Sequence, residues 1–422
     1  MFPLAPLILS PIVRTTLLVG LAFLVACGLG LFLTNPRAAA SYVTEGDISY
    51  DLGSPPDDPA RNMLDIYLPE NDSLVPRPFV LDIHGGGWRT GDKSTPSTPN
   101  KAGLFTSLGY GFVSINYRLS PRTGDPNNPD PNRIMFPDHP DDVGEAIGWL
   151  DRNALSYGLD PDRIILMGHS AGAHLASLVS TDPKYIQRYG VDRRQILGTV
   201  PLDTAAFDIE QSALGSDPDE PDLLNLLFLN AFGTPAENAA SGSWAEASPV
   251  TWADTSDPRH LFLVQDVPYR INRQLTMATK LGQDSSTIIP LALDHIGVNQ
   301  AIGKPGDATP ATPSVTSFIT ERLAAYEEPS VEITDRPPSS LYLKRRGGTV
   351  QKKEVVFRFS GSGNRSGFQC RLDAAPFRSC ASPARYRIGL GRHVFRVRPL
   401  YPSGRPGQVK EVKLTAKVKA GR

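Results

Sequence analysis

The sequence lacks the short motifs that mark metal and nucleotide chemistry. Its 422 residues contain no His-Glu-x-x-His and no cluster of cysteines and histidines, the patterns typical of zinc sites. They contain neither the P-loop pattern nor the Gly-x-Gly-x-x-Gly of dinucleotide-binding folds. We therefore expect no cofactor and no bound metal, and we expect no nucleic-acid partner.

Cysteine is also scarce, and charge is unevenly distributed. Cys27 lies in an apolar N-terminal run, whereas Cys370 and Cys380 lie in a basic C-terminal region. Residues 341–422 hold 20 of the 43 Lys and Arg residues but three of the 44 Asp and Glu residues, although the whole chain has a net charge of −1. An acidic body joined to a basic tail indicates two modules, and the length is sufficient for two domains.

An apolar run at residues 15–34 predicts that the first 40 residues act as a signal peptide or membrane anchor. Cleavage after the three alanines that end at Ala40 would release a chain beginning at Ser41. The run is also long enough to remain as an anchor. A third outcome, lipidation of Cys27, is less favoured because the residues after it stay apolar. Each outcome places the protein outside the cytoplasm, secreted or anchored to the outer face of a bacterial membrane.

A Gly-x-Ser-x-Gly motif occupies residues 168–172. Residues 163–167 before it form a short apolar run of strand formers, and residues 173–179 after it have helical character. A strand, a sharp turn and a helix form the context in which this motif is a nucleophile elbow, with the Ser170 hydroxyl exposed at the top of a sheet. By itself, the motif is equally compatible with a Ser/Gly turn before a buried helix.

A second motif lies about 80 residues upstream. The apolar strand predicted at residues 79–83 ends in His-Gly-Gly-Gly-Trp at 84–88. Glycines let the backbone approach a ligand and direct N–H groups at it, and His-Gly-Gly-Gly is one form of oxyanion loop. Together the two motifs predict an oxyanion hole made by the backbone N–H groups of Gly86, Gly87 and Ala171.

The chain between residues 41 and 327 alternates predicted strands with predicted helices. Strands are expected at 63–69, 79–83, 110–117, 163–167, 260–264 and 288–294, and helices at 140–150 and 173–179. This alternation favours an α/β fold with a mostly parallel sheet and helices on both faces.

The residues from 84 to 179 resemble the α/β-hydrolase superfamily. The resemblance is carried by HGGGWRTGDKS, SINYRLSP, FPDHPDDVGEAIGWL and DPDRIILMGHSAGAHLA. Within the superfamily the chain is similar to carboxylesterases related to hormone-sensitive lipase and to feruloyl-esterase-like enzymes, and GHSAGAHLA also resembles the arylformamidases. The resemblance covers about residues 60–325. It implies a serine hydrolase that acts on a small-molecule ester, and it says little about which one.

The superfamily's chain order of serine, acid and histidine identifies His295 as the base. A serine hydroxyl needs a base within hydrogen-bond reach, and a histidine, with an ordinary pKa of about 6.5, suits that role. His295 follows the late strand predicted at residues 288–294, where the resemblance places the base. The other histidines are assigned to other places: His84 to the oxyanion loop, His169 to the elbow, His174 to the helix after it, His139 to a loop, His260 to the start of a strand and His393 to the tail.

The acid that orients the histidine is predicted to be Asp266, which follows the strand at 260–264. Related enzymes carry His-Gly, then an Asp, then Val-Pro at this point, but here the segment is shortened to Gln-Asp-Val-Pro and lacks the glycine. Asp203 and Asp257 therefore remain open alternatives. Asp294 adjoins His295 and can hardly turn its carboxylate onto the same ring.

A long segment at residues 209–244 is acidic at 217–220 and apolar at 223–229. It is predicted to be either a cap over the site or an ordinary crossover helix.

The tail has a different pattern. Residues 328–349 are expected to be a Pro/Ser-rich linker, and residues 350–422 contain short alternating runs separated by turns, typical of a small all-β sandwich. The pattern F-x-C-x-L-D…F-x-x-C…L-x-x-G-x-H-x-F-x-V-R resembles the Ig-like modules of secreted bacterial proteins. The resemblance implies a disulfide between Cys370 and Cys380, which suits an exported chain. The basic face of this module either binds an anionic cell-envelope surface or is a solvated face on a spacer.

The sequence therefore favours an exported serine hydrolase that cleaves carboxylic esters through an acyl-enzyme on Ser170. One alternative is an amidase or arylformamidase that uses the same triad. The other is a non-catalytic surface binding protein with a hydrolase fold, which would usually have lost Ser170 or the glycine loop.

Overall fold

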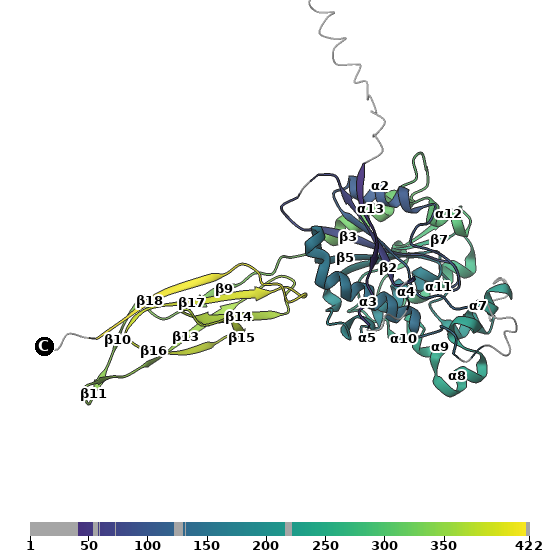
Figure 1. Cartoon of the computed structure of the whole chain (residues 1–422). Coiled ribbons are helices and arrows are strands. Elements are labelled where there is room, and N and C mark those ends of the chain that lie inside the picture. The colour runs from purple at the N-terminus through teal and green to yellow at the C-terminus, as the bar shows by residue number, and fades with distance from the viewer. Residues whose placement is uncertain are drawn as a thin grey trace, which may run out of the picture. The chain divides into compact units, whose positions relative to one another are not determined.

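The structure is a computed structural model of the chain (Figure 1). The structure describes residues 41–418, except 54–57, 59, 72, 122–129, 131 and 216–221. The predicted leader at residues 1–40, with Cys27, and the acidic run at 217–220 lie outside the described residues. Within the described part of the chain, no helix has both the length and the apolar character needed to span a bilayer.

Eight strands form one sheet in the order β1-β2-β4-β3-β5-β6-β7-β8. The strands are β1 (Tyr42–Ser49), β2 (Met63–Pro69), β3 (Arg77–Ile83), β4 (Gly111–Ile115), β5 (Leu159–His169), β6 (Ile196–Leu202), β7 (Phe262–Gln265) and β8 (Ile288–Leu291). Both pairings of β2 are antiparallel, and those from β4 through β8 are parallel. The carboxyl ends of the parallel strands therefore meet at one edge, where a site can form.

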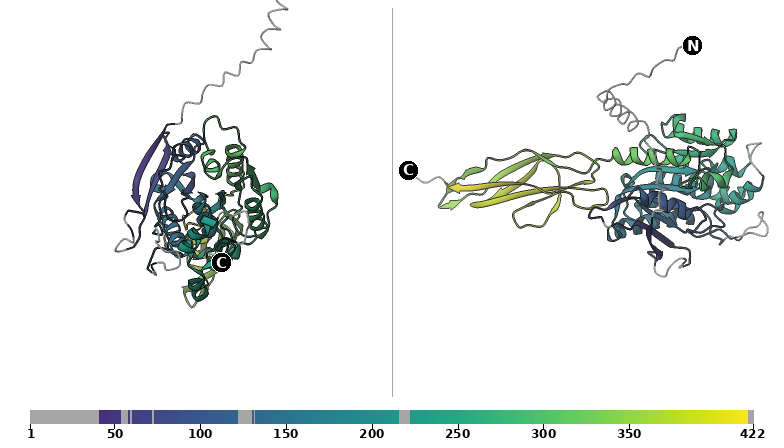
Figure 2. Two further views of the ribbon diagram at one scale, coloured as in Figure 1. Left: turned by 90° about the vertical axis from the view of Figure 1, so that its right-hand side faces the viewer. Right: turned by 90° about the horizontal axis from the view of Figure 1, so that it is seen from above.

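Helices cover both faces of this sheet (Figures 1 and 2). Because successive strand residues point to opposite faces, Leu81 and Ile83 of β3 belong to the same buried cluster as Val143 of α3 (Asp138–Asn153). Val80 belongs instead to a second cluster with Phe105 of α2 (Thr98–Ser107). The expected fold class is confirmed for this domain.

The remaining helices of this domain follow β5 in the chain. They are α4 (Ala171–Thr181), α5 (Lys184–Gln187), α6 (Ile209–Ala213), α7 (Asp222–Phe232), α8 (Pro235–Ser241), α9 (Ser243–Glu246), α10 (Pro249–Trp252), α11 (Pro268–Lys280), α12 (His295–Gln300) and α13 (Ala311–Ala324). The segment expected at 209–244 to be a cap or a crossover thus contains α6 through α9.

The C-terminal strands form a separate β-sandwich. One sheet has the order β10-β18-β17-β14-β15 and another the order β16-β13-β9, with a small β11-β12 pair. The strands are β9 (Glu332–Asp335), β10 (Ser340–Leu343), β11 (Arg345–Arg346), β12 (Thr349–Val350), β13 (Lys353–Ser360), β14 (Gly367–Leu372), β15 (Arg378–Cys380), β16 (Ala384–Ile388), β17 (Gly391–Leu400) and β18 (Lys410–Val418). Phe357 of β13 stacks on Phe395 of β17 with ring centroids 4.0 Å apart, and a disulfide joins Cys370 to Cys380.

The segment at 328–349 differs from the linker that the sequence predicted. It contains strands β9 through β12, and Val331, Leu341 and Leu343 are buried in the core of the sandwich. The prolines and serines between these strands gave the segment a linker-like composition, although the spacing of Leu341 and Leu343 has the period of a strand.

Candidate active site

Ser170 lies in a sharp turn between β5 and α4. Its backbone has φ 55° and ψ −117°, a left-handed conformation that costs energy for a residue with a side chain. The turn is held by a hydrogen bond from the Ser170 N–H to the Leu202 carbonyl, 2.9 Å long. A Cβ at Gly172 would collide with the carbonyl oxygen of Ile83, and one at Gly168 with that of Gly172. Glycine is therefore required at both positions, as expected for the elbow.

The glycine loop after β3 presents unpaired N–H groups beside the serine. Gly86 and Gly87 have φ values of 119° and 60°. The Gly86 carbonyl accepts hydrogen bonds from the amides of Arg89 and Thr90, whereas the amides of Gly86 and Gly87 have no partner in the described part of the chain. The Ala171 N–H is the first of α4 and has no intrahelical acceptor. All three residues line the same cavity as Ser170, so their amides can hold an oxyanion there.

His84 stabilises this loop through contacts of its ring and its carbonyl group with Tyr117. Its ring stacks on Tyr117 with centroids 4.4 Å apart, and the Tyr117 hydroxyl donates to the His84 carbonyl at 3.1 Å. Burial lowers the pKa of His84, so the ring is neutral at physiological pH. Its role is structural, as its place in the loop predicts.

His295, the first residue of α12, is held by a buried carboxylate. Its Nδ1 lies 2.6 Å from Oδ2 of Asp203, which follows β6 and is fully buried. The other oxygen, Oδ1, accepts the Gln265 N–H at 2.9 Å. Burial alone would raise the pKa of Asp203, but the bonds from His295 and Gln265 and the charge of Arg270 outweigh it, and the pKa lies below its ordinary value. Asp203 is therefore ionised and fixes the tautomer of His295.

The structure corrects the predicted acid. Asp266 is exposed, and its amide bonds to the Leu291 carbonyl, while the carboxylate on His295 belongs to Asp203. The reason is the short segment after β7, because α11 begins at Pro268 and the chain enters the helix before a carboxylate can reach the histidine. Asp203 was one of the alternatives left open by the sequence. The signal for it was an Asp directly after the apolar run Val200-Pro201-Leu202, at the edge where the elbow lies.

The other two carboxylates considered from the sequence, Asp257 and Asp294, have partners other than His295. Asp257 pairs with Arg193, and Asp294 caps α12 by accepting the Gly297 N–H at 2.6 Å.

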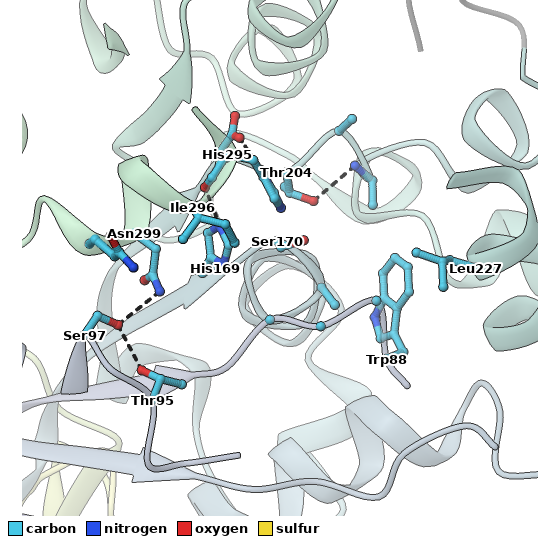
Figure 3. Close-up of a pocket in the computed structure, with 18 of the residues that line it drawn as sticks. Trp88, Thr95, Ser97, His169, Ser170, Thr204, Leu227, His295, Ile296 and Asn299 are labelled. Carbon is cyan, nitrogen blue, oxygen red and sulfur yellow. Dashed lines mark hydrogen bonds and ion pairs between the residues drawn. The ribbon is translucent and has the colours of Figure 1, made fainter. Parts of the chain in front are cut away.

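Ser170 and His295 line one cavity of about 580 Å³ (Figure 3). Since Nδ1 of His295 is bonded to Asp203, Nε2 is the nitrogen available to the serine. Among the described residues there is no direct hydrogen bond between the Ser170 hydroxyl and His295. Such bonds are often long in substrate-free enzymes and shorten in the substrate complex.

The histidine next to the serine supports the base instead of competing with it. Nε2 of His169 lies 2.8 Å from the His295 carbonyl oxygen, and the two rings are 4.5 Å apart. Burial lowers the pKa of His169 to about 3, so the ring is neutral and its Nε2–H donates to that carbonyl. The remaining histidines form hydrogen bonds to groups other than Ser170 and His295: His174 with Ala247, His139 with Ser120, His260 with Pro258 and His393 with Asp373.

The cavity has an apolar side and a polar side. Figure 3 shows Trp88 and Leu227 on one side of Ser170 and Thr95, Ser97 and Asn299 on the other. Leu227 comes from α7 and lies over the glycine loop. Helix α7 is therefore part of the cavity wall. Of the two arrangements that the sequence allowed for residues 209–244, a cap or an ordinary crossover helix, this one corresponds to the cap. In the described part of the chain, no group of His, Cys, Asp and Glu is arranged to hold a metal ion.

Known proteins are similar to part of this domain. A family model described as BD-FAE matches residues 64–210. The probable carboxylic ester hydrolase LipM of Mycobacterium tuberculosis is 32% identical over 227 residues, which cover 53% of this chain and 47% of LipM. The kynurenine formamidase avaC of Aspergillus versicolor is 39% identical over 124 residues, covering 26% of this chain and 38% of avaC. The chain spans less than half the length of these two relatives.

Two solved structures have the same architecture. A truncated form of a carbohydrate esterase from gut microbiota has a TM-score of 0.50 at 19% identity, covering 68% of this chain and 99% of that one. Inhibited esterase B from Lactobacillus rhamnosis has a TM-score of 0.51 at 18% identity, covering 74% of this chain and 96% of that one. These likenesses agree with the sheet order in assigning the fold.

Proposed function

We propose that this chain, whose α/β domain is similar to carboxylic ester hydrolases, cleaves carboxylic esters through an acyl-enzyme on Ser170. One observation carries the proposal. Ser170 on its strained elbow, the Asp203-bound His295 and three unpaired amides all face one cavity. That set provides a nucleophile, a base and an anion site, the three groups that acyl transfer needs.

The reaction follows from these positions. Nε2 of His295 accepts the Ser170 proton as Oγ bonds to the ester carbonyl carbon, and the oxyanion lies against the amides of Gly86, Gly87 and Ala171. The tetrahedral intermediate then collapses, its C–O bond to the alcohol breaks, and His295 returns the proton to the departing oxygen. Water, deprotonated by His295, attacks the acyl-enzyme in the same way and releases the acid and free Ser170.

The proposal is tested with an active-site label and a simple ester. We expect a fluorophosphonate probe to label the protein and p-nitrophenyl acetate to be hydrolysed, and we expect Ser170→Ala to abolish both. Labelling that survives the Ser170→Ala substitution would contradict the proposal. Absence of both labelling and turnover in the unaltered protein would favour the non-catalytic binding protein that the sequence left open.

A formamidase is the second candidate, and the similarity to avaC favours it. The same triad would attack a formamide carbonyl, and His295 would protonate the departing amine. Turnover of N-formyl-kynurenine at a kcat/KM above that for p-nitrophenyl acetate would assign this function instead of the esterase.

We also propose that the protein acts outside the cytoplasm. The apolar run at residues 15–34 and the disulfide between Cys370 and Cys380 support this location. Fractionation of cells that express the full chain, with N-terminal sequencing of the product, tests it. A chain that begins at Ser41 would indicate cleavage, an intact membrane-bound chain an anchor, and a cytoplasmic product would contradict the proposal.

The sandwich supports the proposal that the protein associates with an anionic envelope surface. The outer face of its five-stranded sheet carries Glu411 and six basic residues, Arg371, Arg392, Arg396, Arg398, Lys413 and Lys417. Arg396 and Lys413 pair with Glu411 on this face, and on the other sheet Arg385 pairs with Glu354 and Arg358 with Asp335. We expect salt-sensitive binding to phosphatidylglycerol vesicles that Arg392→Glu with Lys417→Glu weakens and the control Arg385→Glu does not. Equal binding to neutral vesicles would contradict it.

A further inference from the structure

Arg270 contacts Asp203, the acid that is bound to His295. It lies in the first turn of α11, is nearly buried and lines the cavity. Its Nη1 is 3.3 Å from Oδ2 of Asp203, the same oxygen that bonds to His295, and 3.3 Å from the Asp203 main-chain carbonyl. One guanidinium therefore binds both the side chain and the backbone of this residue.

The backbone of Asp203 is held by several contacts. Its φ of 50° is a left-handed conformation that is uncommon for a residue with a side chain, although Asp adopts it more often than most. The Asp203 N–H donates to the Leu263 carbonyl at 2.7 Å, and Oδ1 accepts from Gln265, so β7 holds it from one side. Arg270 holds it from α11, the helix that the short segment after β7 brings close to the site.

The charged groups around His295 are few. Asp203 faces its Nδ1, and the neutral ring of His169 packs on its ring from β5. Asp294 precedes it in the chain but is bonded to the Gly297 N–H. Arg270 is thus the cation that shares the carboxylate on which His295 depends.

We propose that Arg270 is a positioning residue of the proposed esterase: it fixes the Asp203 carboxylate against His295 and takes up part of its negative charge. The proposal rests on the proposed function, because it concerns the same triad. It also explains why the acid can follow β6 in this chain, since α11 supplies the cation that balances a fully buried carboxylate there.

The positive charge of Arg270 affects the pH dependence of kcat/KM in a predictable direction. Esterolysis needs neutral His295, so activity falls at low pH, where the Asp203–His295 pair binds a proton. A neutral residue at position 270 removes a positive charge close to both groups, which favours binding of a proton by the pair. The acidic limb of the kcat/KM profile then moves to higher pH, whichever of the two groups holds the proton.

The test compares Arg270→Met, which removes the charge, with Arg270→Lys, which keeps it. We expect Arg270→Met to move the acidic limb up by about half to one pH unit, so that kcat/KM for p-nitrophenyl acetate falls more at pH 6 than at pH 8. Arg270→Lys should keep the limb at its original pH. Lys280→Met, at the exposed far end of the same helix, is the matched control and should change neither the limb nor the rate.

The outcomes separate the two proposals. An Arg270→Met profile that falls uniformly at all pH values, or an equal shift in Arg270→Lys, would overturn the role of Arg270 while leaving the esterase intact. If Arg270→Met unfolds, the neutral Arg270→Gln is measured in its place. Failure of the unaltered protein to hydrolyse any ester would instead contradict the proposed function.

Discussion

At the scale of single residues, short sequence motifs were sufficient to predict the residues whose positions depend on the local backbone conformation. Ser170, Gly86, Gly87 and Ala171 lie where the sequence predicted, since the strained elbow and the glycine loop are each encoded within five consecutive residues. The acid could not be predicted in the same way. Its carboxylate reaches His295 because of the path taken after β6 and the early start of α11, neither of which is visible in a short motif.

The exchange of Asp266 for Asp203 is directly testable. We expect Asp203→Asn to lower kcat by about 10³–10⁴-fold, because the neutral amide no longer fixes the tautomer of His295 or stabilises its protonated form. Asp266→Asn, at an exposed carboxylate after β7, is the matched control and should change kcat less than twofold. Steady-state kinetics with p-nitrophenyl acetate measure both, and a large loss in Asp266→Asn alone would restore the original prediction.

Leu227 is expected to limit the acyl chain. It comes from α7 and lies over Gly87, on the apolar side of the cavity. Leu227→Ala should raise kcat/KM for p-nitrophenyl octanoate relative to the acetate by about tenfold or more, since each additional methylene that an apolar pocket accommodates gains about 1–3 kcal/mol, or about 10–200-fold. Leu226→Ala, at a neighbouring side chain that is 44% exposed, should leave this ratio unchanged. An unchanged ratio in Leu227→Ala would assign the limit to another residue.

At the scale of the elements, periodicity predicted those that are regular. The spacing of Val143, Ile147 and Leu150 predicted a helix, and α3 buries all three. Strands β9 and β10 were missed because each has four residues and is flanked by prolines and serines, so composition outweighed a short alternation. The pairing of Lys101 with Asp82 was equally hidden, since charged residues in a strand and a helix ordinarily indicate exposed faces.

That pair joins α2 to β3 and supports a stability prediction. Lys101 and Asp82 are 1% and 3% exposed, and Nζ lies 2.9 and 3.0 Å from the two carboxylate oxygens. Lys101→Met leaves a buried charge without its partner and should lower the free energy of unfolding by about 3–5 kcal/mol. The double substitution Lys101→Met with Asp82→Leu removes both charges and should recover most of this loss. Urea-unfolding curves of the unaltered protein and of the two variants measure this free energy.

The control for this prediction is an exposed pair in the same domain. Lys184 lies 3.4 Å from Glu246, and both side chains are substantially exposed. Lys184→Met should change the free energy of unfolding by at most about 1 kcal/mol. A loss from Lys101→Met no larger than this would contradict the interpretation of the buried pair.

At the scale of the whole molecule, the chain contains separate hydrophobic cores. The three clusters of the α/β domain contain residues between Tyr50 and Ile319, whereas the cluster of the sandwich contains residues between Val331 and Ala416. The sequence predicted this division from the shift in charge and from the change of pattern, because each module carries its own composition.

Separate cores predict separate responses to loss of the disulfide. Cys370 and Cys380 are ten residues apart, and a loop of that size contributes roughly 2–3 kcal/mol in the chain-entropy model. The Cys370→Ala, Cys380→Ala double variant should lower the thermal midpoint of the sandwich while kcat for p-nitrophenyl acetate is retained. Calorimetry and an ester assay on the same sample test this. A parallel loss of both would show that the sandwich supports the catalytic domain.

The contact between the elbow and the strand beside it limits how this protein can diversify. Because a Cβ at Gly172 would collide with the carbonyl oxygen of Ile83, the elbow and the strand before the glycine loop are in direct backbone contact. Any side chain at position 172 would therefore push these two segments apart. The walls at α7 and at the loop that carries Thr95 and Ser97 are made by side chains instead, so substitutions there can reshape the cavity while the backbone contact behind Ser170 is kept.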